Sequence, residues 1–103
     1  MENFENVTVA KKGNSYYDGK VTSRTLTFAD GTIKTLGIMQ VGDYEFGTSQ
    51  HELMEITSGE LQVKLPKSSV WRTMKGGDAF EIEANEKFQV RVKTLTDYCC
   101  SYS

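Results

Sequence analysis

The sequence predicts an all-β protein with one domain, built as a sandwich or a barrel. Apolar and polar residues alternate strictly along several short stretches, which is typical of half-buried antiparallel strands. No stretch repeats apolar residues at positions i, i+3, i+4 and i+7 over three turns, so no amphipathic helix is expected. Turn residues recur about every 8–12 positions, and a chain of 103 residues suggests a single domain.

The first element is a short N-terminal segment. Residues 1–13 carry Val7 and Val9 at strand spacing, followed by turn residues. We interpret this segment as an edge strand or a frayed end, and residues 14–103 as the domain itself.

A hairpin is predicted next. Residues 20–28 are rich in β-branched side chains and form its first strand, and residues 33–41 form the returning strand. The connection over 29–32 contains Asp-Gly, which favours turn residues with positive φ. Gly37 inside the returning strand indicates a bulge or a close approach of the backbone to another group.

The stretch over residues 42–65 contains three predicted strands, and the rest of the chain is interpreted around it. Its inward positions form three sets with period two: Tyr44, Phe46 and Thr48; Glu52, Met54 and Ile56; Leu61, Val63 and Leu65. Glu52 is the one carboxylate among them. Because an unpaired charge is costly to bury, Glu52 is the leading candidate for a functional residue.

Four further short strands are predicted over residues 70–74, 79–82, 88–92 and 97–102. In the last of them, Tyr98, Cys100 and Tyr102 share one face. Cys99 faces the other way, so no disulfide between the two neighbours is expected and both thiols are predicted to be free.

Charge and composition exclude several classes of partner. Twelve Lys and Arg against fourteen Asp and Glu give a net charge of −2, which offers no broad surface for nucleic acid. No apolar run reaches the ~18 residues that a membrane span needs. The N-terminus lacks a basic-then-apolar signal pattern, so a cytoplasmic location is expected. Dinucleotide and phosphate-loop fingerprints are absent.

Two spacings resemble the cupin pattern, a double-stranded β-helix or jelly-roll barrel. Gly59 stands seven positions after the inward Glu52, and Gly77-Asp78 begins a second strand motif. The histidines that cupins place ahead of the glutamate to bind a metal are missing, and His51 faces away from Glu52. We therefore expect that Glu52 is not a metal ligand and that the protein uses no metal and no cofactor.

A second resemblance covers nearly the whole chain from Asn14 onward. The residues that carry it are Gly19-Lys20-Val21, Gly37-Ile38-Met39, Tyr44-x-Phe46-x-Thr48, Glu52, Met54, Ser58-Gly59, Leu65-Pro66, Trp71, Phe88 and Tyr98-x-Cys100-x-Tyr102. In order and spacing they resemble the small bacterial pyrimidine/purine nucleoside phosphorylase family, whose members are single-domain cupins. The chain departs from that family at residues 83–87, where the family has a Pro-Gly-His type of turn.

The resemblance implies a pentosyltransferase of broad specificity, which converts purine and pyrimidine nucleosides plus phosphate to free base and ribose 1-phosphate. Phosphate would then be a co-substrate held by cations, hydroxyls or backbone N–H groups. The base would be held by stacking on an aromatic face.

Glu52 is the predicted catalytic residue, with a structural ion pair as its alternative role. For phosphate the candidates are Lys20, Arg91 and Thr48, each of which could equally be an ordinary strand or surface residue. For the base the predicted contacts are Tyr44, Phe46 and Tyr98. The other aromatic candidates are Trp71, Phe88 and Tyr102, and any of the six could instead belong to the core.

Two interpretations of function stay open on the sequence alone. The first is the phosphorylase, with nucleosides and inorganic phosphate as its partners. The second is a non-catalytic cupin that binds a small metabolite, which the missing metal histidines fit equally well. A homodimer is expected in either case, because strands rich in Val and Thr near the N-terminus could pair across a two-fold axis.

Overall fold

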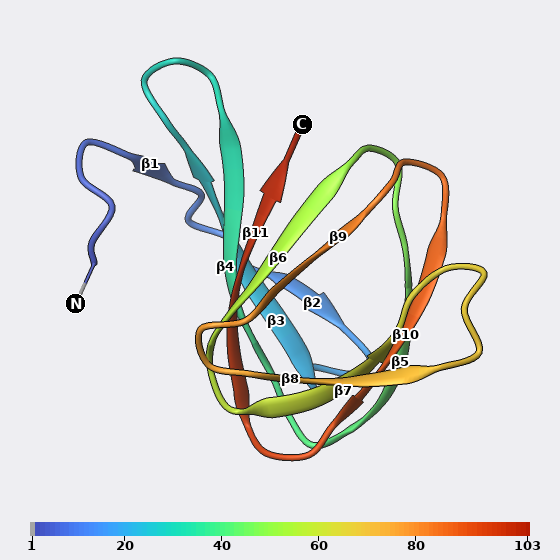
Figure 1. Cartoon of the computed structure of the whole chain (residues 1–103). Helices are drawn as coiled ribbons and strands as arrows, with labels where there is room; N and C mark the ends of the chain where they lie inside the picture. Colours follow the sequence, from blue (N-terminus) through green and yellow to red (C-terminus); the bar gives the residue numbers. More distant parts are fainter. Residues whose placement is uncertain (1) are drawn as a thin grey trace.

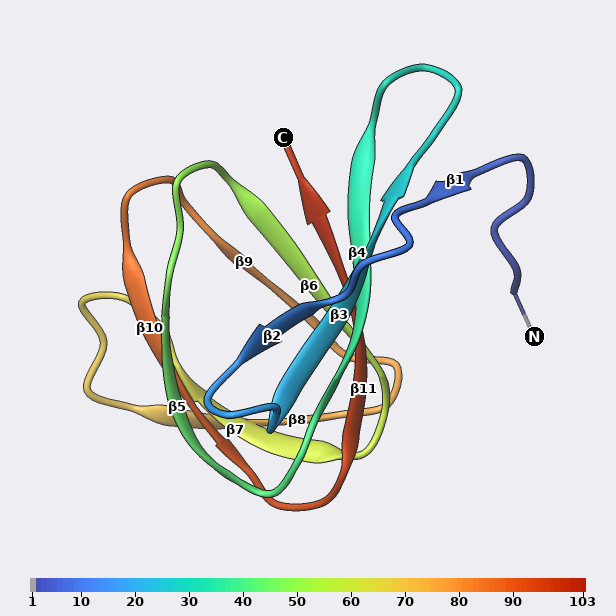
Figure 2. The ribbon, with the colours of Figure 1, turned by 180° about the vertical axis from the view of Figure 1, so that it is seen from behind.

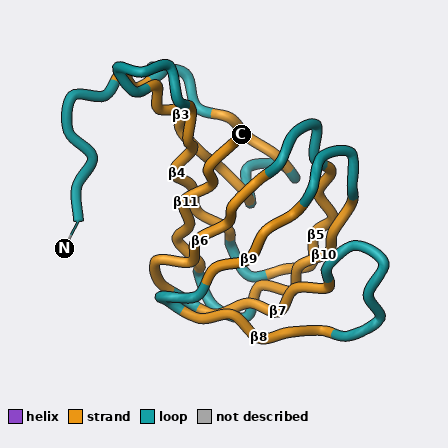
Figure 3. The backbone as a smooth tube through the Cα atoms, turned by 45° about the horizontal axis from the view of Figure 1, so that its top comes forward, coloured by secondary structure: helices purple, strands orange, loops and turns teal. Residues whose placement is uncertain are grey.

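The computed structural model describes residues 2–103, which form strands and connecting loops (Figure 1). The strands are β1 (Thr8–Val9), β2 (Asn14–Tyr16), β3 (Val21–Thr27), β4 (Ile33–Met39), β5 (Gly42–Gly47), β6 (Glu52–Ser58), β7 (Glu60–Lys64), β8 (Trp71–Lys75), β9 (Ala79–Ile82), β10 (Lys87–Val92) and β11 (Thr96–Tyr102). Residues 2–103 contain no helix, and thus none that could cross a membrane (Figure 3).

The strands form two antiparallel sheets that face each other. The larger sheet has seven strands in the order β1-β3-β4-β11-β6-β9, with β2 also paired to β3. The smaller sheet has four strands in the order β5-β10-β7-β8. The chain passes repeatedly from one sheet to the other, as Figure 2 shows from behind. The jelly-roll barrel expected from the sequence is thereby confirmed.

Period-two alternation fills the space between the sheets. In β7 the side chains of Leu61 and Val63 are fully buried, and in β10 those of Val90 and Val92 are nearly so. They pack in one cluster with Ile56 of β6 from the opposite sheet. Burial of this apolar surface is the main force that holds the two sheets together.

β11 lies in the middle of the larger sheet and pairs with β4 on one side and β6 on the other. Its register against β6 shifts between Asp97 and Tyr98, which marks a β-bulge. The Thr57 hydroxyl donates a hydrogen bond to the Asp97 carbonyl there, at 2.9 Å, and so compensates for the interrupted pairing.

Gly37 of β4 lies opposite Tyr98 of β11, and the Tyr98 ring occupies the space where a side chain would stand. A Cβ atom at this position would come within 2.5 Å of both the Tyr98 hydroxyl and the Thr22 carbonyl oxygen. The glycine thus marks a close approach, one of the two meanings that its position predicted.

Two local features differ from the expectation. β2 is a strand in a stretch where the sequence predicts no strand. The Asn14 side chain fixes it by donating to the hydroxyls of Ser23 and Thr25 at 3.2 and 3.1 Å. In the β3–β4 hairpin only Gly31 has positive φ, whereas Asp30 does not. Asp30 instead accepts a hydrogen bond from the Thr32 N–H at 2.9 Å, an Asx turn.

The N-terminal segment extends away from the barrel beside the β3–β4 hairpin (Figures 1 and 2). Its strand β1 pairs with β3 at the edge of the larger sheet. Phe4 reaches the hairpin, where its ring lies 5.2 Å from that of Phe28, edge to face.

Replacing Gly37 with alanine should destabilise the fold. Because the new methyl group would clash with backbone as well as with Tyr98, we expect the free energy of unfolding to fall by about 2 kcal/mol or more. Urea unfolding followed by tyrosine and tryptophan fluorescence measures the change. Gly47→Ala is the matched control, since its nearest atom would be the Glu86 oxygen at 3.9 Å, an ordinary contact. Equal stability of the two variants would contradict the close approach at Gly37.

Candidate active site

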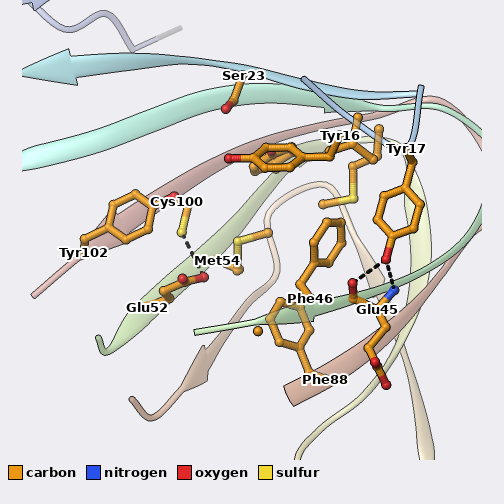
Figure 4. Close-up of a pocket in the computed structure, with 14 residues that line it drawn as sticks. Tyr16, Tyr17, Ser23, Glu45, Phe46, Glu52, Met54, Phe88, Cys100 and Tyr102 are labelled. Carbon is orange, nitrogen blue, oxygen red and sulfur yellow. Dashed lines mark hydrogen bonds between the residues drawn. The ribbon is translucent and has the colours of Figure 1, made fainter. Parts of the chain in front are cut away.

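A cavity of about 370 Å³ opens between the two sheets (Figure 4). Strands of both sheets and the β2–β3 turn contribute to its walls. The lining residues are Tyr16, Tyr17, Val21, Ser23, Met39, Glu45, Phe46, Gly47, Glu52, Met54, Phe88, Tyr98, Cys100 and Tyr102. The volume is within the range of sites for small molecules.

Glu52, the first residue of β6, lines this cavity and is half-buried. Its Oε1 lies 3.5 Å from the Cys100 Sγ. Burial raises the pKa of the Glu52 carboxyl group, while the hydrogen bond from Cys100 and the nearby His51 oppose that rise. His51 itself points away as expected, with Nδ1 at 3.0 Å from the Ser103 hydroxyl and Nε2 at 3.7 Å from Glu81.

Three side chains of β11 form the wall beside Glu52. Tyr98, Cys100 and Tyr102 alternate along the strand and all face the cavity. The Tyr102 hydroxyl also lies 3.2 Å from that of Thr35. Burial raises the pKa of Tyr98 to about 12 and, with the negative charge of Glu52, that of Cys100 to about 12. These two groups therefore keep their protons at neutral pH and can donate hydrogen bonds.

The other end of the cavity is aromatic. Phe46 of β5 lies 5.7 Å from Phe88 of β10, centroid to centroid, and 5.9 Å from Tyr17, edge to face. Figure 4 shows this group apart from Glu52, Cys100 and Tyr102, with Met54 between them. The cavity thus has a polar end and an aromatic end.

Tyr16 ends β2 and Tyr17 begins the turn that follows it, a region that the sequence did not mark as part of a site. Tyr17 and Asp18 have φ of 53° and 55°, a left-handed conformation that is uncommon for side chains of this kind. The Tyr17 hydroxyl donates to the Glu45 carbonyl at 2.5 Å and accepts from the Glu45 N–H at 3.1 Å. The turn is therefore fastened to the edge of β5. Two adjacent tyrosines before Asp-Gly were the available signal, because aromatic rings on a tight turn have little core to enter.

Of the predicted site residues, Glu52, Phe46 and Tyr98 come together around the cavity. Tyr44 and Thr48 share the inward parity but do not line it. The Tyr44 hydroxyl instead donates to the Gln40 carbonyl at 2.8 Å.

The Thr48 hydroxyl is hydrogen-bonded to the turn over residues 83–87, where the chain departs from the family pattern. Its hydroxyl donates to the Glu83 carbonyl at 2.6 Å and accepts from the Glu86 N–H at 3.0 Å. Asn85 supplies the left-handed residue of this turn, with φ of 62°. In this structure Thr48 therefore holds a turn in place.

The two predicted phosphate cations lie elsewhere. Lys20 is exposed, just before β3, and its carbonyl accepts a hydrogen bond from the Gln40 N–H at 2.8 Å. Arg91 is exposed on the outer face of the smaller sheet, where its guanidinium stacks 3.9 Å from the centroid of the Trp71 ring. No lysine or arginine of the described residues 2–103 lines the cavity. The charged side chains in the cavity wall are those of Glu45 and Glu52.

Comparison of the sequence with known proteins shows the family to which the chain belongs. The family model for pyrimidine/purine nucleoside phosphorylase matches residues 11–102. A protein of that name from Sulfurovum sp. (strain NBC37-1) is 64% identical over 102 residues, which is 99% of each chain. Another of the same name, from Wolinella succinogenes, is 58% identical over 99% of this chain and 97% of its own.

Solved structures agree on the fold. A crystal structure of a protein of unknown function from Acinetobacter sp. ADP1 is 37% identical, covers 98% of both chains and superposes with a TM-score of 0.95. An RmlC-like cupin from Shewanella frigidimarina superposes with a TM-score of 0.71 at 14% identity, over 100% of this chain and 88% of its own. The chain has the cupin fold, and it belongs to the pyrimidine/purine nucleoside phosphorylase family.

Proposed function

We propose that this protein is a nucleoside phosphorylase of broad specificity and that the cavity between the sheets is its active site. The observation that carries the proposal is a cavity with a half-buried carboxyl group at one end and aromatic rings at the other, in a chain of this family. The products would be a free purine or pyrimidine base and ribose 1-phosphate.

The aromatic end fits the base. Phe46, Phe88 and Tyr17 offer faces and edges of rings to a planar heterocycle. Stacking tolerates different bases because every base has a π-face. No amide or basic side chain stands among these three to select one hydrogen-bonding edge, which supports acceptance of both purines and pyrimidines.

The polar end fits the ribose. Glu52 would accept hydrogen bonds from ribose hydroxyls, and its negative charge would stabilise the positive charge that develops at C1′. In the reaction a phosphate oxygen bonds to C1′ while the C1′–N bond breaks, and its electron pair leaves with the base, which takes up a proton.

Phosphate would have to be held without a cation from this chain's cavity wall. The donors available there are the hydroxyls of Tyr16, Ser23, Tyr98 and Tyr102. Several neutral donors can together hold an anion, since each hydrogen bond to a charged group is stronger than one between neutral groups.

Glu52→Gln should lower phosphate-dependent release of base from uridine and adenosine by about tenfold or more. The amide keeps the shape of the side chain but loses the charge. Chromatography of the free base, with and without phosphate, measures the change. Glu55→Gln is the matched control, because Glu55 is exposed on the other face of the same strand.

Turnover of Glu52→Gln at the wild-type rate would remove Glu52 from the mechanism. If the wild-type protein released no base in a phosphate-dependent way, the alternative of a non-catalytic metabolite-binding cupin would be favoured.

The same variant should gain stability relative to the wild type as pH rises. Folding raises the pKa of Glu52, so the folded state holds this proton more tightly than the unfolded state. The wild-type free energy of unfolding then declines as pH rises from the ordinary value of 4.5 through the raised pKa, whereas the glutamine of the variant does not titrate. Urea unfolding at about pH 4 and pH 8 tests this. A stability difference that stays constant between these pH values, or one matched by Glu55→Gln, would count against a buried carboxyl group.

A homodimer also remains a prediction. Leu36 and Ile38 of β4 are exposed at 39% and 42%, although β4 is paired with a strand on each side. Exposed apolar side chains at such positions are common where chains associate. Light scattering during gel filtration should give the mass of two chains, and the mass of one chain at all concentrations would contradict the prediction.

A further inference from the structure

The Cys100 thiol lies in the cavity wall and has no part in the function proposed so far. It is 2% exposed and faces the cavity from β11. Its neighbour Cys99 is also buried but faces the opposite side of the sheet, towards Val9 and Leu36. The two thiols therefore provide matched positions in the same strand, one in the cavity and one outside it.

Geometry and protonation assign the direction of the contact between Cys100 and Glu52. The Sγ atom lies 3.5 Å from Glu52 Oε1, within reach of a hydrogen bond from sulfur. Burial and the negative charge of Glu52 raise the pKa of Cys100 to about 12, so the thiol keeps its proton at neutral pH. It therefore donates, and the carboxylate accepts.

Within residues 2–103 this is the one hydrogen bond that the Glu52 side chain makes. The other ionisable groups facing Glu52 on β11 are Tyr98 and Tyr102, whose pKa values burial raises, so that both stay neutral. His51, which precedes β6, and Glu81 of β9 lie together on the other face of the sheet. Glu45 of β5 also lines the cavity.

We propose that Cys100 is a positioning residue of this site: its thiol donates to Glu52 Oε1 and holds the carboxyl group towards the cavity. The consequence for catalysis rests on the proposed function, whereas the contact itself does not. A sulfur donor suits the place because it is small and weakly polar. It orients the carboxylate without fully compensating its burial, and so leaves the charge available to substrate.

The first test measures Glu52 directly, in the absence of substrate. The side-chain carboxyl carbons of Glu are labelled with ¹³C and titrated by NMR, and the Glu52 signal is assigned by its loss in Glu52→Gln. Cys100→Ala removes the donor, so the pKa of Glu52 should rise by about half a pH unit. Cys100→Ser restores a donor and should return it to the wild-type value or below. Cys99→Ala, the control, should leave it unchanged.

A Glu52 titration that is the same in Cys100→Ala and the wild type would overturn the proposal. So would an equal rise in the alanine and serine variants, since the loss of volume and not of the donor would then be the cause. If the alanine variant does not fold, the serine variant decides alone: a raised pKa contradicts the proposal, and an equal or lowered one supports it.

The second test is the pH dependence of phosphate-dependent base release. The limb that reports Glu52 should move in Cys100→Ala in the same direction as the NMR titration, and Cys100→Ser should reverse it. A shift of the Glu52 NMR titration without a shift of the pH dependence of base release would separate the proposed contact from the proposed function. The thiol would still position Glu52, but Glu52 would have no part in turnover.

Discussion

The pairing of β11 with two neighbours at once fixes both the centre of the larger sheet and one wall of the cavity. Residues 98–101 are bonded to β4 on one side and β6 on the other, so their side chains can point only to the two faces of the sheet. Tyr98, Cys100 and Tyr102 enter the cavity as a row, while Cys99 is excluded from it. The bulge at Asp97 and Tyr98 sets the phase of this row, and the bare backbone of Gly37 gives the first tyrosine its place. The chemistry of the polar end thus follows from the register of one strand.

Alternation was enough to predict an all-β sandwich or barrel, most of its strands and the face on which their side chains stand, and the resemblance to cupins added the jelly-roll arrangement. It brought Glu52, Phe46 and Tyr98 to the cavity, and it separated His51 from Glu52 and Cys99 from Cys100. These outcomes share a cause, since a period of two leaves a strand residue only two directions. The family resemblance added the expected chemistry, which no periodicity contains.

What alternation does not describe is the distance along a strand at which the cavity ends. Tyr44 and Thr48 flank Phe46 with the same parity, yet their hydroxyls satisfy backbone groups of neighbouring loops. Tyr16 and Tyr17 were missed because they lie at a turn, where alternation does not apply. They reach the cavity beside a turn whose left-handed residues include Tyr17 and Asp18, and this conformation leaves no periodic trace. The positions of the Lys20 and Arg91 side chains depend on contacts between segments that are distant in the sequence. Arg91, for example, stacks on the Trp71 ring on the outer surface.

The bond between Tyr17 and Glu45 has a second consequence. β5 is the outer strand of the smaller sheet, and its unpaired N–H and C=O groups could accept a strand from another molecule. A single phenol occupies both the donor and the acceptor of Glu45. Tyr17, which lines the cavity, therefore also blocks the pairing groups of this edge strand at Glu45. A substitution of Tyr17 would therefore change the wall of the cavity and uncover the edge of β5 at the same time.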